Sequence, residues 1–174
     1  MSQSALTISG VDKFYGPIDR GVHAVQNLTM EIDKGEIVAL LGSSGCGKTS
    51  TLRMIAGFEE VSRGSISVAG RKVHTLPPVK RNVAMAFEGY SKVASIAKLL
   101  EIEDILERYP SSISGGQQQR ASLGRALIRE ADLHLLDEPM GQLEPQLRAV
   151  LRGRIKHFIK ERGLTAILVT HDQT

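Results

Sequence analysis

The sequence predicts an α/β domain with a largely parallel sheet flanked by helices, and three observations lead to this prediction. Residues 36–41 (EIVALL) and 133–136 (LHLL) are short apolar segments, a pattern typical of buried strands. Segments with helical start and stop signals lie between such strands, for example residues 145–162, which begin at Pro145 and stop at Gly163. Strands that alternate with helices along a chain favour a layered α/β domain.

The same signals predict the remaining elements in chain order. Apolar or alternating segments predict strands at residues 6–11, 28–32, 36–41, 65–68, 82–87, 133–136 and 165–170. Helical periodicity predicts helices at residues 48–56, 94–100, 102–109, 115–129 and 145–162. Gly57, Pro110 and Gly163 mark expected helix ends, and Ser114 is the expected N-cap of the 115–129 helix.

Composition narrows the class of protein. A chain of 174 residues has room for one domain with a substantial core. The net charge of +3 and the absence of Trp argue against a dedicated nucleic-acid binder. A single cysteine excludes an internal disulfide and a zinc site built from cysteines. No apolar run reaches the ~18 residues of a membrane helix, and residues 1–9 lack the features of a secretory signal. We therefore expect a soluble, cytoplasmic globular domain.

A phosphate-binding loop is predicted at residues 42–49 (GSSGCGKT). They match G-x-x-x-x-G-K-[ST] directly after a predicted strand and at the start of a predicted helix. Glycines let backbone N–H groups point at phosphate oxygens, and the helix N-terminus adds partial positive charge. Lys48 would reach the β and γ phosphates, and the Thr49 hydroxyl would ligate Mg²⁺. The alternative is a chance glycine-rich turn. We expect Cys46 to contribute its backbone rather than act as a nucleophile, because no His lies nearby in sequence.

Two adjacent carboxylates, Asp137 and Glu138, follow the predicted strand at residues 133–136. In a parallel α/β sheet the carboxyl ends of the strands line the ligand crevice. Asp137 would hold Mg²⁺ directly or through water, and Glu138, which points the other way, would face the attacking water as general base. The alternative is a strand followed by two solvated acids. The phosphate loop in the same chain favours the metal and base roles.

Further motifs carry a resemblance to a known family. Residues 114–120 (SGGQQQR) resemble the signature motif of ABC transporter ATPases, and His171, within residues 168–172 (LVTHD), is similar to that family's switch histidine. The order of phosphate loop, signature, carboxylate pair and histidine also matches. Residues 41–57 (LGSSGCGKTSTLRMIAG) look most like the ATP-binding subunits of carbohydrate-type importers. The resemblance covers nearly the whole chain and implies a P-loop NTPase fold with a small N-terminal antiparallel β portion.

The resemblance also implies the cofactors, ATP and Mg²⁺, and the residues of the site. It gives catalytic roles to Glu138, His171 and Lys48, and Mg²⁺ ligation to Thr49, Asp137 and Glu88. Within the chain, ATP would be contacted by Tyr15, which stacks on adenine, and by Gly42, Ser43, Ser44, Gly45, Cys46, Gly47, Lys48, Thr49 and Ser50. A second copy would contact the γ-phosphate of the same ATP through Ser114, Gly115, Gly116 and Gln117.

The sequence departs from the family pattern at several positions. Ile113 replaces the usual Leu before the signature, and Glu144 replaces an Asp that contacts the second subunit. Glu88 stands where the family usually has Gln. Glu88 would lie near the other carboxylates of the site. Two carboxylates about 5 Å apart, at an effective dielectric near 20, repel each other by about 3 kcal/mol. Mg²⁺ carries twice the opposite charge, so we expect Glu88 to make the nucleotide-bound site more dependent on Mg²⁺. A Glu88→Gln variant with an unchanged Mg²⁺ titration would contradict this hypothesis.

The chain is short for the family it resembles. Only 25 residues separate Glu88 from Ser114, where family members carry a longer helical subdomain that docks the membrane partner. We therefore interpret residues 1–174 as an incomplete ABC-type ATP-binding domain. The helical subdomain is shortened around residues 91–113, and a C-terminal part is absent after 174. The shortening is either a real deletion or a stretch missing from this sequence.

The resemblance implies an ATP-binding and ATP-hydrolysing subunit of an ABC transporter of the sugar-importer type, driven by nucleotide-dependent dimer closure. The implied partners are a second ATPase subunit and transmembrane permease subunits, at the cytoplasmic side of the inner membrane. No direct contact with nucleic acid is expected. Two alternatives remain at this point: an ATP-binding module without coupled transport, and a soluble ABC ATPase that acts on nucleic acid.

Overall fold

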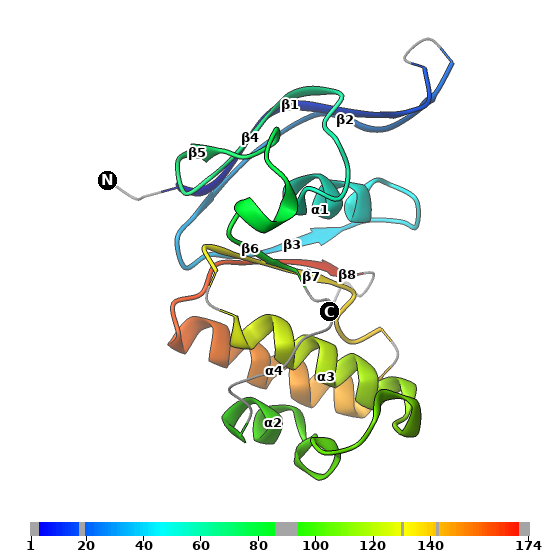
Figure 1. Cartoon of the computed structure of the whole chain (residues 1–174), viewed down its shortest axis with the longest axis vertical. Coiled ribbons are helices and arrows are strands. Elements are labelled where there is room, and N and C mark those ends of the chain that lie inside the picture. The colour runs from blue at the N-terminus through cyan, green and yellow to red at the C-terminus, as the bar shows by residue number, and fades with distance from the viewer. Residues whose placement is uncertain (1–3, 18–19, 86–93, 130, 142, 171–174) are drawn as a thin grey trace.

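Two four-stranded sheets form separate layers in the part of the chain that the structure describes (Figure 1). The computed structural model describes residues 4–17, 20–85, 94–129, 131–141 and 143–170. The antiparallel sheet has the order β2-β1-β4-β5, with β1 (Ser4–Tyr15), β2 (Val22–Asp33), β4 (Arg63–Val68) and β5 (Arg71–Lys72). The parallel sheet has the order β3-β8-β7-β6, with β3 (Ile37–Leu41), β8 (Ala166–Thr170), β7 (Leu133–Asp137) and β6 (Val83–Met85). The predicted α/β class is confirmed.

The helices fill the space on both sides of the parallel sheet. Helix α1 (Lys48–Ala56) lies between the two sheets, and a cluster of buried apolar residues there includes Leu52, Ile66 and Leu135. Helices α2 (Ala94–Leu100), α3 (Gly115–Ile128) and α4 (Pro145–Glu161) cover the opposite face, where a second apolar cluster forms (Figure 1). Short 3₁₀ turns occur at η1 (Pro78–Lys80), η2 (Glu103–Ile105) and η3 (Pro110–Ser112). The phosphate loop therefore lies in a different layer from α3.

The antiparallel portion is larger than the sequence predicts. The strands expected at residues 6–11 and 28–32 lie within β1 and β2, each of which has 12 residues. Their pairing contains several register shifts, one of them between Ile8 and Val11, beside Gly10 with a φ of 56°. Each shift interrupts the period-2 alternation on which the prediction relies, so the alternation does not mark the full length of either strand. The strand expected at 82–87 is β6, and residues 86–87 lie outside the described residues.

The predicted helix at residues 102–109 is wrong. Glu101 takes a left-handed φ of 54°, which ends α2, and only the 3₁₀ turn η2 follows before Pro110. Ile102 and Ile105 are both buried, and their spacing of three residues suits the three-residue period of a 3₁₀ turn. The apolar spacing was therefore real, but the segment is too short for the α-helical period to distinguish the two forms.

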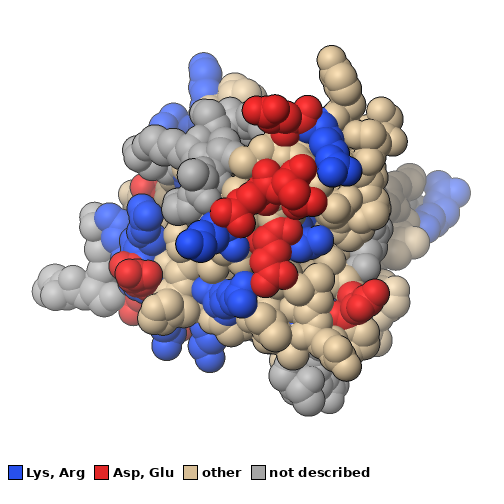
Figure 2. All heavy atoms as spheres, turned by 90° about the horizontal axis from the view of Figure 1, so that it is seen from below, with Lys and Arg blue, Asp and Glu red and all other residues tan. Residues whose placement is uncertain are grey.

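The lower end of the molecule is charged. Figure 2 shows acidic side chains gathered in the middle of this face, with Lys and Arg around them. Four acidic residues between 101 and 107 are exposed: Glu101, Glu103, Asp104 and Glu107. The ion pair from Arg154 Nη1 to Glu101 Oε1, at 2.7 Å, is half-exposed, so it contributes at most ~1 kcal/mol. None of the described helices is long and apolar enough to cross a membrane.

Candidate nucleotide-binding site

The loop between β3 and α1 is folded tightly against β2. Gly45 and Gly47 have φ values of 81° and 89°, in the left-handed region that favours glycine. A Cβ on Gly47 would collide with the Ala24 carbonyl oxygen and approach Val25 Cγ2 to 3.0 Å. Only glycine therefore fits at this position of the predicted phosphate loop. The loop leads directly into the N-terminus of α1, where unpaired backbone N–H groups and the helix dipole attract anions.

Lys48 directs its charge into the curve of this loop. The side chain is 9% exposed, and its Nζ donates to the carbonyl oxygens of Gly42 at 2.7 Å and Ser43 at 2.8 Å. Cys46 Sγ lies 3.4 Å from the same Nζ, and the Cys46 thiol is free and exposed. The ammonium group thus lies within the loop that the sequence assigns to phosphate binding. A phosphate oxygen entering the loop would replace carbonyl oxygens as the partner of this cation.

Thr49 and Asp137 come from different elements and meet beside the loop. Thr49 Oγ1 donates to Asp137 Oδ1 at 3.3 Å. Burial raises the pKa of the Asp137 carboxyl, as does the neighbouring Glu138, whereas the Thr49 hydrogen bond lowers it. Hydroxyl and carboxylate oxygens are the ligands that Mg²⁺ prefers, and Mg²⁺ takes its remaining ligands from water and phosphate. The two residues therefore fit the expected metal, whose charge would favour the ionised carboxylate.

Glu138 holds an unusual backbone conformation at the end of β7. Its φ of 44° is left-handed, which costs a non-glycine residue of this kind about 1 kcal/mol or more. The backbone N–H donates to the Val169 carbonyl oxygen at 3.1 Å, and the Glu138 carbonyl oxygen accepts from the Gly141 N–H at 3.1 Å. The residue is exposed, directly after the half-buried Asp137. Strained residues of this kind cluster at functional sites.

Tyr15 lies at the end of β1, beside the start of α1. Its hydroxyl is 3.1 Å from Ser50 Oγ, and its side chain is 39% exposed. Lys13 Nζ lies 4.8 Å from the centre of the Tyr15 ring. An exposed aromatic ring at this distance from the phosphate loop is placed where a purine base could stack. No motif in the sequence predicted the contacts of Tyr15 with Ser50 and Lys13.

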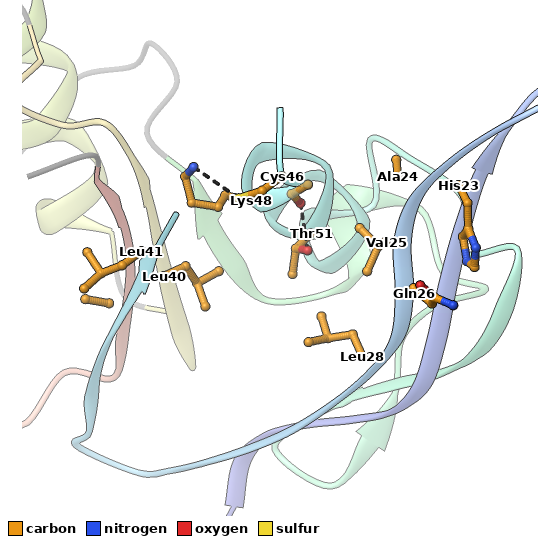
Figure 3. A pocket seen from close by; sticks show the side chains of 12 residues that line it. His23, Ala24, Val25, Gln26, Leu28, Leu40, Leu41, Cys46, Lys48 and Thr51 are labelled. Atoms are coloured by element: carbon orange, nitrogen blue, oxygen red, sulfur yellow. Dashed lines mark hydrogen bonds between the residues drawn. The ribbon is translucent and has the colours of Figure 1, made fainter. Parts of the chain in front are cut away.

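A pocket of about 630 Å³ opens between β2, β3 and α1. Figure 3 shows side chains from all three elements around it, including His23 and Val25 of β2, Leu41 of β3 and Lys48 of α1. This volume lies within the ~300–1,000 Å³ of small-molecule sites. The sequence predicted the loop side of this pocket. It missed the β2 side, because residues 22–26 carry no motif.

The signature residues lie at the N-terminus of α3. Ser114 is the N-cap: its Oγ accepts from the Gln117 N–H at 3.2 Å, and its own N–H donates to Gln117 Oε1 at 2.9 Å. This reciprocal capping box fixes the start of the helix. Gly115 begins α3, and Gly116 follows it. Helix α3 lies on the opposite face of the parallel sheet from α1 (Figure 1).

Two predicted site residues, Glu88 and His171, lie outside the described residues. The remaining predicted residues form two groups. The loop, Lys48, Thr49, Tyr15 and Asp137 gather around the start of α1. Ser114 and its neighbours lie at the start of α3, and Gln119 Nε2 of the same helix donates to the Glu138 carbonyl oxygen at 2.8 Å. The sequence did not single out Gln119.

Solved structures share this architecture. An ATP-binding cassette in a dimeric post-hydrolysis state bound to ADP and Pi has a TM-score of 0.83 and 23% sequence identity, over 96% of this chain and 88% of that chain. A second ATP-binding cassette, of an ABC transporter in its ADP conformation, has a TM-score of 0.82 and 17% identity. It covers 99% of this chain and 83% of that chain. At these identities the likeness concerns the fold.

Comparison of sequences identifies the family. The sn-glycerol-3-phosphate import ATP-binding protein UgpC of Vibrio cholerae serotype O1 is 40% identical over 182 aligned residues, which cover 89% of this chain and 49% of the relative. UgpC 1 of Rhizobium johnstonii is 39% identical over 198, covering 97% and 52%. The chain thus spans about half the length of these relatives. A family model described as ABC transporter matches residues 25–141. The chain belongs to the ABC transporter family.

Proposed function

We propose that this chain binds and hydrolyses ATP as the nucleotide-binding subunit of an ABC importer of the sugar type. One observation carries the proposal: Lys48 Nζ lies inside the loop at 2.7 Å from the Gly42 carbonyl oxygen, and the Thr49–Asp137 pair lies beside it. This arrangement offers a cation, backbone donors and two metal-ligating oxygens to one triphosphate. The relatives named as sn-glycerol-3-phosphate import proteins support an organic phosphate or sugar as the solute.

The chain's own residues divide the work of hydrolysis. Lys48 and the loop N–H groups, with the start of α1, stabilise negative charge on the transferred phosphoryl group. Glu138 accepts a proton from the attacking water as general base, and His171 steadies that water. Tyr15 stacks on adenine beside Ser50. Thr49, Asp137 and Glu88 would hold Mg²⁺, which supplies charge neutralisation on the phosphates when bound.

Four residues at the start of α3 act on the nucleotide of a second copy: Ser114, Gly115, Gly116 and Gln117. The start of α3 and the phosphate loop lie on opposite faces of the parallel sheet, which supports contact in trans (Figure 1). The capping box holds Ser114 and Gln117 in fixed positions at a helix N-terminus, which is a suitable place for a γ-phosphate. Two copies would therefore enclose two ATP molecules. We place this dimer on permease subunits, at the cytoplasmic side of the inner membrane.

The helical subdomain decides whether the proposed function includes transport, because in the family it docks the membrane partner. The alignment to the Vibrio relative has 182 positions, more than the 174 residues of this whole chain, although only 89% of the chain is aligned. The relative therefore carries residues without a counterpart here. Such a shortfall within the aligned region is what a shortened helical subdomain predicts, and we propose that it lies around residues 91–113. A second candidate function follows, namely an ATP-binding module that is not coupled to transport.

The experiment is a comparison of wild type with Glu138→Gln. The variant keeps the size of the side chain and loses the base. We expect ATP affinity, measured by titration calorimetry, to stay within about threefold, and turnover to fall by about 10²-fold or more, as for loss of a general base. If turnover by Glu138→Gln equals that of the wild type, Glu138 is not the general base. ATP binding without turnover in the wild type would favour the uncoupled module.

A further inference from the structure

A side chain of α3 forms a hydrogen bond to the backbone at the end of β7. Gln119 Nε2 donates to the Glu138 carbonyl oxygen at 2.8 Å, a short and therefore well-formed bond. Gln119 lies five residues after Ser114, in the second turn of the helix that begins with the signature. Glu138 follows the last residues of β7. The bond thus links the layer of helices to the loop that carries the general base.

Glu138 depends on hydrogen bonds for its conformation. A left-handed φ of 44° at a glutamate persists only where the surroundings fix it. Two of the bonds that fix it are backbone bonds at 3.1 Å, from its N–H to Val169 of β8 and from the Gly141 N–H to its carbonyl oxygen. Gln119 provides a third bond, from a different helix and layer. The backbone conformation at Glu138 sets the direction in which its side chain leaves the end of β7.

We propose that Gln119 is a positioning residue for hydrolysis. It holds the Glu138 backbone so that the carboxylate keeps its direction toward the attacking water. It also connects that direction to the start of α3, where Ser114 would meet the nucleotide of the second copy. This inference rests on the proposed function, in which Glu138 is the general base. A misplacement of about 1 Å at a catalytic group can lower a rate by up to about 10²-fold. Loss of the hydrogen bond from Gln119 can therefore lower the rate of hydrolysis measurably.

The test compares Gln119→Met with Gln118→Met. Both replace a glutamine amide with an apolar side chain of similar length on the same helical turn. Gln118 Nε2 donates to the carbonyl oxygens of Pro110 at 2.9 Å and Ile113 at 3.2 Å, and these bonds do not involve Glu138. We expect Gln119→Met to lower kcat about tenfold, which corresponds to about 1.4 kcal/mol, with KM for ATP within twofold of wild type. Gln118→Met should leave both within twofold. An unchanged kcat in Gln119→Met would overturn the proposal.

A double-mutant cycle separates positioning from general damage. If Gln119 acts through Glu138, adding Gln119→Met to Glu138→Gln should change the residual single-turnover rate by less than twofold. If the two losses multiply, Gln119 acts independently of Glu138 and the proposal is wrong.

Hydrogen exchange distinguishes failure of this proposal from failure of the proposed function. The proposed function fails if the wild type has no turnover or Glu138→Gln keeps it. Amide hydrogen exchange over residues 138–141 then decides whether Gln119 holds the Glu138 backbone. Faster exchange in Gln119→Met than in Gln118→Met supports this role of Gln119, and equal exchange in the two variants refutes it.

Discussion

Arg81 binds the C-terminal end of α1, the helix that follows the phosphate loop, and replacing it tests how much these bonds stabilise the protein. The side chain is 5% exposed, and four of its hydrogen bonds go to backbone carbonyl oxygens. Nη1 donates to Met54 at 2.7 Å and Ile55 at 3.2 Å, in the last turn of α1. Nε donates to Leu76 at 2.7 Å, and Nη2 donates to His74 at 3.1 Å. Burial lowers the pKa of this guanidinium, but arginine stays protonated in proteins. Arg81 therefore closes the C-terminal end of α1 with a permanent positive charge.

Replacing Arg81 by Met leaves those four carbonyl oxygens without this donor. A buried polar group that loses its partner costs about 1–3 kcal/mol, and for these four carbonyl oxygens together we expect a loss of about 3–5 kcal/mol in the free energy of unfolding. For a chain of this length each 1 kcal/mol lowers Tm by about 2–4 °C, so we expect a fall of about 10 °C. Arg71 of β5 is exposed, and Arg71→Met is the matched control, with a change within about 0.5 kcal/mol.

Urea unfolding followed by circular dichroism measures both free energies, and a thermal scan gives Tm. A loss below 1 kcal/mol in Arg81→Met, or an equal loss in Arg71→Met, would refute the assignment of Arg81 as the residue that closes α1.

Two further predictions concern the loop and the pH dependence of stability. Gly47→Ala should lower ATP affinity by at least about tenfold in titration calorimetry, because its Cβ would collide with the Ala24 carbonyl oxygen. Gly153→Ala, in an open part of α4, should leave affinity unchanged and add about 0.5–1 kcal/mol of stability. Burial lowers the pKa of His134, so the folded state keeps the ring neutral while the unfolded state binds a proton below about pH 6.5. The free energy of unfolding should therefore fall as pH drops from 7 to 5. The free energy of unfolding of His134→Leu should fall less than that of the wild type over that range. An equal fall in the two proteins would contradict the role of His134.

The parts of the site that were predictable from sequence are those built from adjacent residues. Lys48 and Thr49 belong to one contiguous motif, and Asp137 and Glu138 end one apolar strand, so local sequence identifies them. Their meeting also follows, because parallel strands carry their carboxyl ends at the same edge of the sheet.

The features that sequence did not predict depend on pairings between distant segments. Tyr15 reaches Ser50, and Gln119 reaches Glu138, only because the sheets and helices pack as they do. The β2 wall of the pocket has no motif, and the bulges of β1 hide its full length. Residues 102–109 show the same limit at short range, since Ile102 and Ile105 satisfy both a helical and a 3₁₀ period.

The central claim is that this chain hydrolyses ATP at the loop around Lys48 with Glu138 as base. Its most direct test is the rate of phosphate release from Mg²⁺·ATP by the purified wild-type chain, measured beside Glu138→Gln at equal nucleotide occupancy. We predict a wild-type rate about 10²-fold or more above that of the variant. Equal rates for the two proteins, with ATP bound to both, would contradict the claim.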